Sequence, residues 1–149
     1  MKKLLLLLVV SVGLVGCATG PTLKSYTTSD AACIKGGMAN FIKYYSDGEA
    51  HVSIQTIDDA STSMMSSNCF PPGKHRVGVS AVHVSQSVHG FIDYEFRAST
   101  NYQVEAHLHG NSFAFDLFDI SSTPEKKVSE FALDVNSSVP VFIPIFIPR

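Results

Sequence analysis

The stretch YQVEAHLHGNSFAFDLFD, residues 102–119, alternates apolar and polar side chains on both sides of a Gly-Asn pair. A period of two places successive side chains on opposite faces, which is the pattern of half-buried β-strands. Gly110 and Asn111 suit a two-residue hairpin with glycine at the first central position. The hairpin then sets apolar residues opposite one another on one face: Leu108 with Phe113, Ala106 with Phe115 and Val104 with Leu117.

The preceding segment, residues 91–98, alternates in the same way. If Ser99, Thr100 and Asn101 form a three-residue loop, this segment pairs with the strand at 102–109. The apolar faces then match: Phe96 with Val104, Tyr94 with Ala106 and Ile92 with Leu108. Two independent loops agree on one buried face, and this agreement predicts a three-stranded meander over residues 91–119.

The rest of the chain indicates the same class of fold. No segment after residue 32 keeps an apolar 3.6-residue period for about twelve residues without Gly, Pro or a β-branched cluster. Pro72 and Gly73 suit the centre of a turn that launches the next strand. Further strands are expected at 33–36, 51–57 and 76–84. With 149 residues, of which 45% are hydrophobic, we expect one all-β domain over residues 33–149. Its expected architecture is a small antiparallel β-sandwich of the transthyretin or immunoglobulin-like type.

The first sixteen residues, MKKLLLLLVVSVGLVG, have a basic start followed by apolar and small residues. Residues 4–16 would make roughly 20 Å of helix, whereas a bilayer core is roughly 30 Å thick. They therefore read as a signal peptide, residues 1–16, and not as a membrane span.

The junction LVGC, residues 14–17, resembles the lipobox of bacterial lipoproteins. The resemblance implies cleavage before Cys17 and acylation of that cysteine, which would anchor the protein stably on a membrane. Ala18 stands where an aspartate would favour retention in the inner membrane, so the outer membrane is implied, with the domain facing the periplasm or the cell surface. An ordinary cleaved signal peptide is the alternative.

Residues 17–32 are rich in Gly, Pro and hydroxyl side chains and lack an apolar period, so we expect a lipidated tether. Removing Lys2 and Lys3 with the leader leaves nine basic residues against 13 acidic ones, a formal charge of −4. No basic stripe remains, and a nucleic-acid partner is not expected.

Cys33 and Cys69 remain as an even pair once Cys17 is lipidated. In an oxidising compartment such a pair predicts a disulfide. Two buried free thiols are the alternative. No histidine flanks either cysteine in a pattern typical of a catalytic thiol.

The order ACIKG, VSIQTID, PPGKHRVGV and YEFRASTNYQVEAHL, within about residues 33–119, resembles small β-sandwich lipoproteins of bacterial envelopes and PEGA-type modules. In those modules a Pro-Gly turn precedes a strand and a later strand opens near a tyrosine. The resemblance implies a non-catalytic envelope protein and supplies no functional residues. The sequence IDD at 57–59 and the Pro-rich end depart from it.

Two histidines one residue apart, His107 and His109, suggest part of a metal site. They share the polar face of their predicted strand with Gln103 and Glu105, and the predicted meander puts Asp93 opposite His107. Such ligands would suit zinc or copper, with Asp93 as third ligand or as the group that orients an imidazole. A solvated strand face is the alternative reading.

No hydrolase elbow, zinc-protease helix or phosphate loop occurs in the sequence, so we do not expect an enzyme. The C-terminal stretch at 139–149, VPVFIPIFIPR, is expected to be an edge strand blunted by proline, or an apolar peptide that docks on a partner or on lipid. The sequence therefore predicts a lipid-anchored envelope protein with a binding or structural role, and an envelope protein as its partner. A periplasmic metal-binding protein is the alternative.

Overall fold

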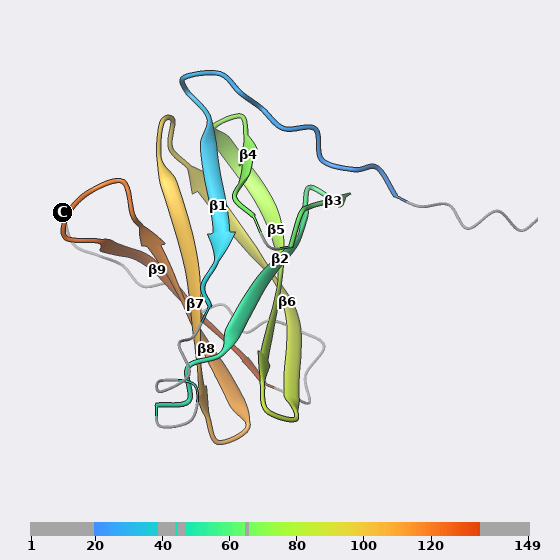
Figure 1. Ribbon diagram of the computed structural model, residues 1–149, viewed down its shortest axis with the longest axis vertical. Helices are drawn as coiled ribbons and strands as arrows, with labels where there is room; N and C mark the ends of the chain where they lie inside the picture. The colour runs from blue at the N-terminus through green and yellow to red at the C-terminus, as the bar shows by residue number, and fades with distance from the viewer. Residues whose placement is uncertain (1–19, 39–43, 45–46, 65, 135–149) are drawn as a thin grey trace, which may run out of the picture.

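A computed structural model describes residues 20–38, 44, 47–64 and 66–134, and these form two β-sheets packed face to face (Figure 1). One sheet contains, in spatial order, β3 (Ala60–Ser61), β2 (His51–Ile57), β5 (Gly73–His83) and β6 (Gln86–Phe96). The other contains β4 (Asn68–Phe70), β1 (Ala32–Gly36), β7 (Asn101–His109), β8 (Ser112–Asp119) and β9 (Lys126–Asp134). The predicted all-β sandwich is confirmed. Within the described residues, no helix is long and apolar enough to cross a membrane.

The period of two locates most strands well. The strands predicted at 51–57 and 112–119 have the expected bounds, and β5 starts at Gly73, inside the predicted Pro-Gly turn and three residues before the predicted strand at 76–84. The strands β3, β4 and β9 were not predicted. β3 has two residues and β4 has three, too few to display a period. β9 carries large apolar residues only at its end, where Phe131 and Leu133 are buried.

The hairpin of β7 and β8 forms in the predicted register. Leu108 pairs with Phe113, Ala106 with Phe115 and Val104 with Leu117. Gly110 has φ 63°, a backbone angle that glycine adopts without steric cost, at the first position of the turn.

The predicted hairpin between residues 91–98 and 102–109 is wrong. β6 pairs with β5, and the backbone crosses to the opposite sheet between Phe96 and Asn101. Ser99 turns this corner with φ 54°, and its N–H donates to Asp30 O at 3.1 Å. The apolar faces of β6 and β7 do meet, but they meet across the core of the sandwich.

Aromatic side chains fill the core beneath this corner. The Phe96 ring lies edge to face with Phe70 and Tyr102, with ring centroids 5.0 Å apart in both pairs. Buried Tyr102 also accepts a hydrogen bond on its hydroxyl oxygen from the Arg97 N–H at 2.9 Å. A tyrosine bonded back to the preceding corner is a device that other β-sandwiches use where the chain changes sheet.

The other edge of β7 is occupied along its length by two successive segments. β1 runs parallel to β7, with Cys33 beside Asn101 and Gly36 beside Val104. Beyond β1, residues 48–50 continue the pairing: Ala50 N–H donates to Ala106 O, and Leu108 N–H donates to Gly48 O, both at 2.7 Å. The chain then enters β2, so this segment joins the two sheets.

The end of β1 passes very close to β2, at Gly36 and Gly37. Gly37 N–H donates to Val104 O in one sheet, and Gly37 O accepts from Val52 N–H in the other. A Cβ atom on Gly36 would lie 1.9 Å from Val52 O, a backbone atom that cannot move without disturbing these bonds. The joint between the sheets therefore requires glycine.

We expect Gly36→Ala to lower the free energy of unfolding by at least about 2–3 kcal/mol, because the added methyl group meets rigid backbone. Urea unfolding measures the change. Gly20→Ala is the matched control, since a Cβ there would have only Asp59 O nearby, at 4.0 Å. Equal stability of the two variants would contradict this account of the joint.

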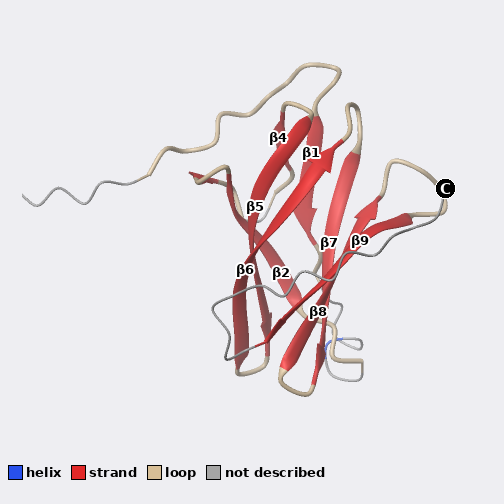
Figure 2. Ribbon diagram, turned by 180° about the vertical axis from the view of Figure 1, so that it is seen from behind, coloured by secondary structure: helices blue, strands red, loops and turns tan. Residues whose placement is uncertain are grey.

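The predicted tether at 17–32 is attached to the sandwich over much of its length. Pro21 O accepts from Ser61 N–H, and Leu23 N–H donates to Ser61 O, both at 2.8 Å. Tyr26 N–H donates to Cys69 O at 3.1 Å, and Ala32 already begins β1. Figures 1 and 2 show this segment running along the sandwich past β4 and leaving beside β3. The predicted C-terminal edge strand or docking peptide at 139–149 lies outside the described residues.

Candidate functional site

The two histidines of the suggested metal site lie where the sequence placed them. His107 and His109 share the outer face of β7 with Gln103 and Glu105, and the Gln103 side-chain amide donates to the Glu105 carboxylate at 2.8 Å. The Gln103 and His107 side chains are partly buried, and His109 is exposed.

The proposed third ligand, Asp93, is not opposite His107. Asp93 lies on the exposed face of β6 and pairs with Arg76 of β5, whereas His107 pairs with Ala114 of β8. Asp93 and His107 therefore lie on opposite outer faces of the sandwich. The predicted pairing is wrong because β6 and β7 belong to different sheets.

The carboxylate residue beside His107 comes from a loop that carried no strand signal. Glu49 forms an isolated antiparallel bridge with His107, and it is 9% exposed. Nevertheless, within the part of the chain that the structure describes, no three His, Cys, Asp or Glu residues lie close enough together to hold a metal ion. Zinc or copper binding through His107, His109 and Asp93 thus has no supporting geometry.

A different histidine has well-defined partners. His75 Nδ1 lies 2.5 Å from Asp58 Oδ2, and His75 Nε2 lies 2.9 Å from Pro71 O. The ring also packs edge to face on Phe70, with centroids 4.9 Å apart. Since both ring nitrogens are engaged, neither is free to take a proton from a nucleophile, and the arrangement clamps the turn after β2 to the turn before β5.

Asp58 is the charged member of this clamp. Burial raises its pKa, but the N–H of Arg76, the hydrogen bond from His75 and the charge of His75 outweigh burial and hold the pKa below its ordinary value. The Asp58 carboxylate accepts from Arg76 N–H at 2.9 Å. A carboxyl group whose pKa is lowered by folding stabilises the folded state at pH values above its pKa in the unfolded chain. This stabilisation is lost as the pH falls through the pKa of the folded state.

We therefore expect Asp58→Asn to cost about 1 kcal/mol at pH 6, a value reduced by the partial exposure of the side chain. The difference from wild type should shrink as the pH falls below about 4, because protonation removes the same charge from the wild-type protein. Urea midpoints from pH 6 to pH 2.5 measure it. Asp59→Asn in the same turn is the control, and an equal, pH-dependent loss there would contradict the assignment.

A second group of rings lies at the start of β2. The Tyr44 ring stacks on His51 with centroids 4.9 Å apart and tilts against His83 at 4.7 Å. His83 Nε2 donates to Tyr44 O at 2.6 Å, and the Tyr44 hydroxyl oxygen accepts from Val84 N–H. These contacts connect the segment before β2 to the hairpin of β5 and β6. The positions of His51 and His83 in the sequence did not predict this connection.

Two shallow grooves flank the loop between β3 and β4. One, of about 360 Å³, lies between this loop and the N-terminal segment, and hydroxyl side chains dominate its lining. The other, of about 320 Å³, lies between the loop and the end of β1, where Lys35, Met38 and Met64 line it. Neither groove contains a histidine or a carboxylate, and Lys35 is the one ionisable side chain among their described lining residues.

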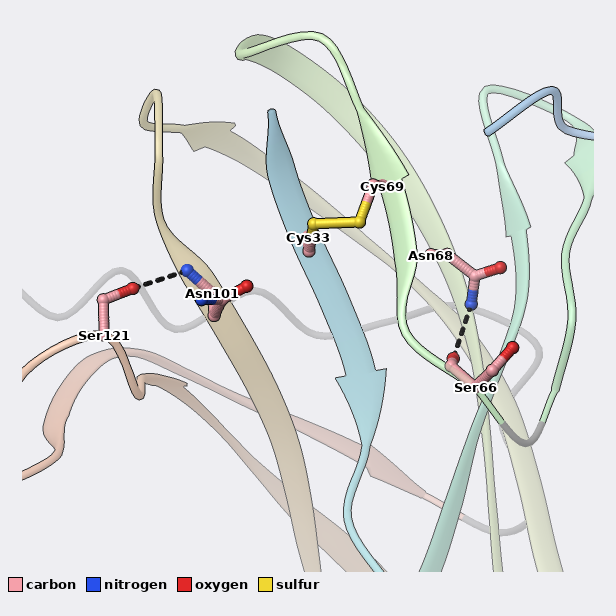
Figure 3. The surroundings of a disulfide bond; sticks show 6 residues. All are labelled: Cys33, Ser66, Asn68, Cys69, Asn101 and Ser121. Atoms are coloured by element: carbon pink, nitrogen blue, oxygen red, sulfur yellow. Dashed lines mark hydrogen bonds between the residues drawn. A yellow bond between two sulfur atoms is a disulfide. The ribbon is translucent and has the colours of Figure 1, made fainter. Parts of the chain in front are cut away.

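The predicted disulfide between Cys33 and Cys69 is confirmed. The two residues are direct partners in the antiparallel pairing of β1 with β4, and their Cα atoms are 4.1 Å apart. Figure 3 shows the bond joining the two strands beside Asn68, the first residue of β4, and Ser66 in the loop before it. Asn68 holds that loop through its side-chain amide, which donates to Ser63 O and Ser66 O at 3.0 Å.

Reduction of the disulfide should lower the free energy of unfolding by about 4 kcal/mol, because it releases a 36-residue loop in the unfolded chain. Urea unfolding with and without dithiothreitol measures the loss. The Cys33→Ala/Cys69→Ala variant should be destabilised to a similar extent and should not respond to the reductant. A wild-type midpoint unchanged after complete reduction would contradict the prediction.

Comparison with known proteins gives no assignment. No protein family matches the chain, and no curated protein or solved structure matches it.

Proposed function

We propose that the protein is a non-catalytic lipoprotein of a bacterial cell envelope, anchored by Cys17 and acting as a binding or structural accessory. The basic start, the apolar run of residues 4–16 and the LVGC junction support this anchor. Several acyl chains on one cysteine would hold the domain stably on a membrane. Ala18 favours the outer membrane, with the domain facing the periplasm or the cell surface.

The observation that carries the proposal is the disulfide between Cys33 and Cys69. Disulfides persist in oxidising compartments, and an export leader delivers a chain to such a compartment. The leader and the disulfide are separate features of the sequence, and both favour the same location.

An accessory role fits the chemistry of the described residues. The best-defined histidine, His75, has both ring nitrogens engaged, and the two grooves beside the loop between β3 and β4 contain no histidine or carboxylate. The mature chain carries a formal charge of −4, which disfavours nucleic acid. We propose another envelope protein as the partner.

The anchor can be tested by labelling cells with palmitate and measuring the mass of the mature protein. We expect wild type to carry acyl groups on Cys17, and Cys17→Ala to incorporate no label. The Cys33→Ala/Cys69→Ala variant is the matched control and should be labelled as wild type is. Wild-type protein without any acyl group would refute the proposed anchor.

A further inference from the structure

The N-terminal segment reaches the sandwich very soon after the proposed anchor. Only three residues, Ala18, Thr19 and Gly20, separate Cys17 from Pro21, whose carbonyl accepts a hydrogen bond from Ser61 N–H. Four residue steps span at most about 14 Å in an extended chain. An acylated Cys17 lies at the level of the lipid headgroups, so β3 would be held within that distance of the membrane surface.

The segment is also fixed along the sandwich and does not act as a long flexible stalk. Leu23 packs against the hydrophobic core, and its N–H bonds to Ser61. Further along, Tyr26 N–H bonds to Cys69 O. The described part of the segment is thus bound to the sandwich from Pro21 onward.

The surface beside this exit point has a distinctive composition. Residues 60–73, ASTSMMSSNCFPPG, contain no charged side chain, although 16% of the chain is charged. Met38 and Met64 are 67% and 56% exposed, and they line one groove together. We call this surface the anchor-side face and define it by Thr22, Lys35, Met38, Met64, Ser66 and Ser67.

These side chains suit the headgroup layer of a bilayer. Hydroxyl groups can donate to phosphate and ester oxygens, and exposed methionine gains by leaving water. Charged side chains are costly to desolvate, and Lys35 is the only one on this face; its charge is opposite to that of a lipid phosphate. Two neighbouring acids are already engaged: the Asp58 carboxylate is bonded to His75 and to Arg76 N–H, and the Glu105 carboxylate accepts from the Gln103 amide at the margin of the Met38 groove.

We propose that the anchor-side face docks on the bilayer that holds Cys17, which orients the sandwich on the membrane. This inference rests on the proposed lipid anchor. The short connection brings the anchor-side face to the headgroups. Because none of the six residues that define this face is acidic, a domain of net negative charge can approach the headgroups on this side. The hairpins of β5 with β6 and of β7 with β8 then point away from the exit of the N-terminal segment, as the ribbon in Figure 1 indicates.

The test uses the full-length, processed protein in vesicles of phosphatidylethanolamine and phosphatidylglycerol that contain nitroxide-labelled headgroups. A fluorescent amino acid is placed at Ser67 on the anchor-side face, or at Asn111 in the β7–β8 hairpin. We expect the nitroxide to quench the fluorophore at 67 several-fold more strongly than the one at 111. Equal quenching in protein that floats with the vesicles would overturn docking but leave the anchor intact.

Two changes separate docking from mere proximity. A long Gly-Ser insertion after Ala18 keeps the anchor and should leave the quenching at 67 high if the face binds lipid. Met38→Glu/Met64→Glu should lower it several-fold, whereas Val82→Glu/Val84→Glu, at exposed apolar positions of the β5–β6 hairpin, should not. Equal effects of the two double variants would overturn the proposal. Protein that does not float with vesicles would overturn the anchor, and docking with it.

Discussion

The structure depends on how the two backbone edges of β7 are occupied. β8 takes one edge by a tight hairpin, while β1 and then residues 48–50 take the other. An unpaired interior strand edge would leave buried N–H and C=O groups without partners, at a cost comparable to several lost hydrogen bonds. Once both edges are filled, β6 has no place beside β7 and must belong to the other sheet. The close approach at Gly36 and Gly37 and the corner closed by Tyr102 follow from this arrangement.

The disulfide and the N-terminal segment strengthen a short edge strand of the sandwich. β4 has three residues and lies at the edge of its sheet, where a short strand has few hydrogen bonds of its own. The bond from Cys33 ties it to β1, Asn68 orders the loop that precedes it, and Tyr26 adds a backbone hydrogen bond to Cys69. Oxidation and the path of the N-terminal segment are therefore coupled through one small strand.

The partners of each histidine depend on its place in the fold and not on its spacing in the sequence. His107 and His109 have metal-site spacing along the sequence, but their strand places them on an outer face, away from Asp93. His75 has no such spacing, and yet the fold brings it to Asp58, Pro71 and an aromatic core. Asp58 directly follows β2, and its position there gave no signal of this pairing, since the contact joins residues 17 apart in the sequence.

The sequence by itself determined most of the longer strands, which of their faces are buried and which cysteines pair. Alternation, turn residues and an even number of cysteines are local properties, and they predicted β2, the β7–β8 register and the disulfide. Only the tertiary structure decided which strands are neighbours. In a sandwich, the apolar faces of two strands can be buried together either as neighbours within one sheet or across the core from opposite sheets. The apolar residues match equally well in both arrangements. The choice depended on which segments pair with the edges of β7. One of these edges is taken by residues 32–50, which lie far in the sequence from the corner between β6 and β7. No local sequence pattern therefore predicts the outcome.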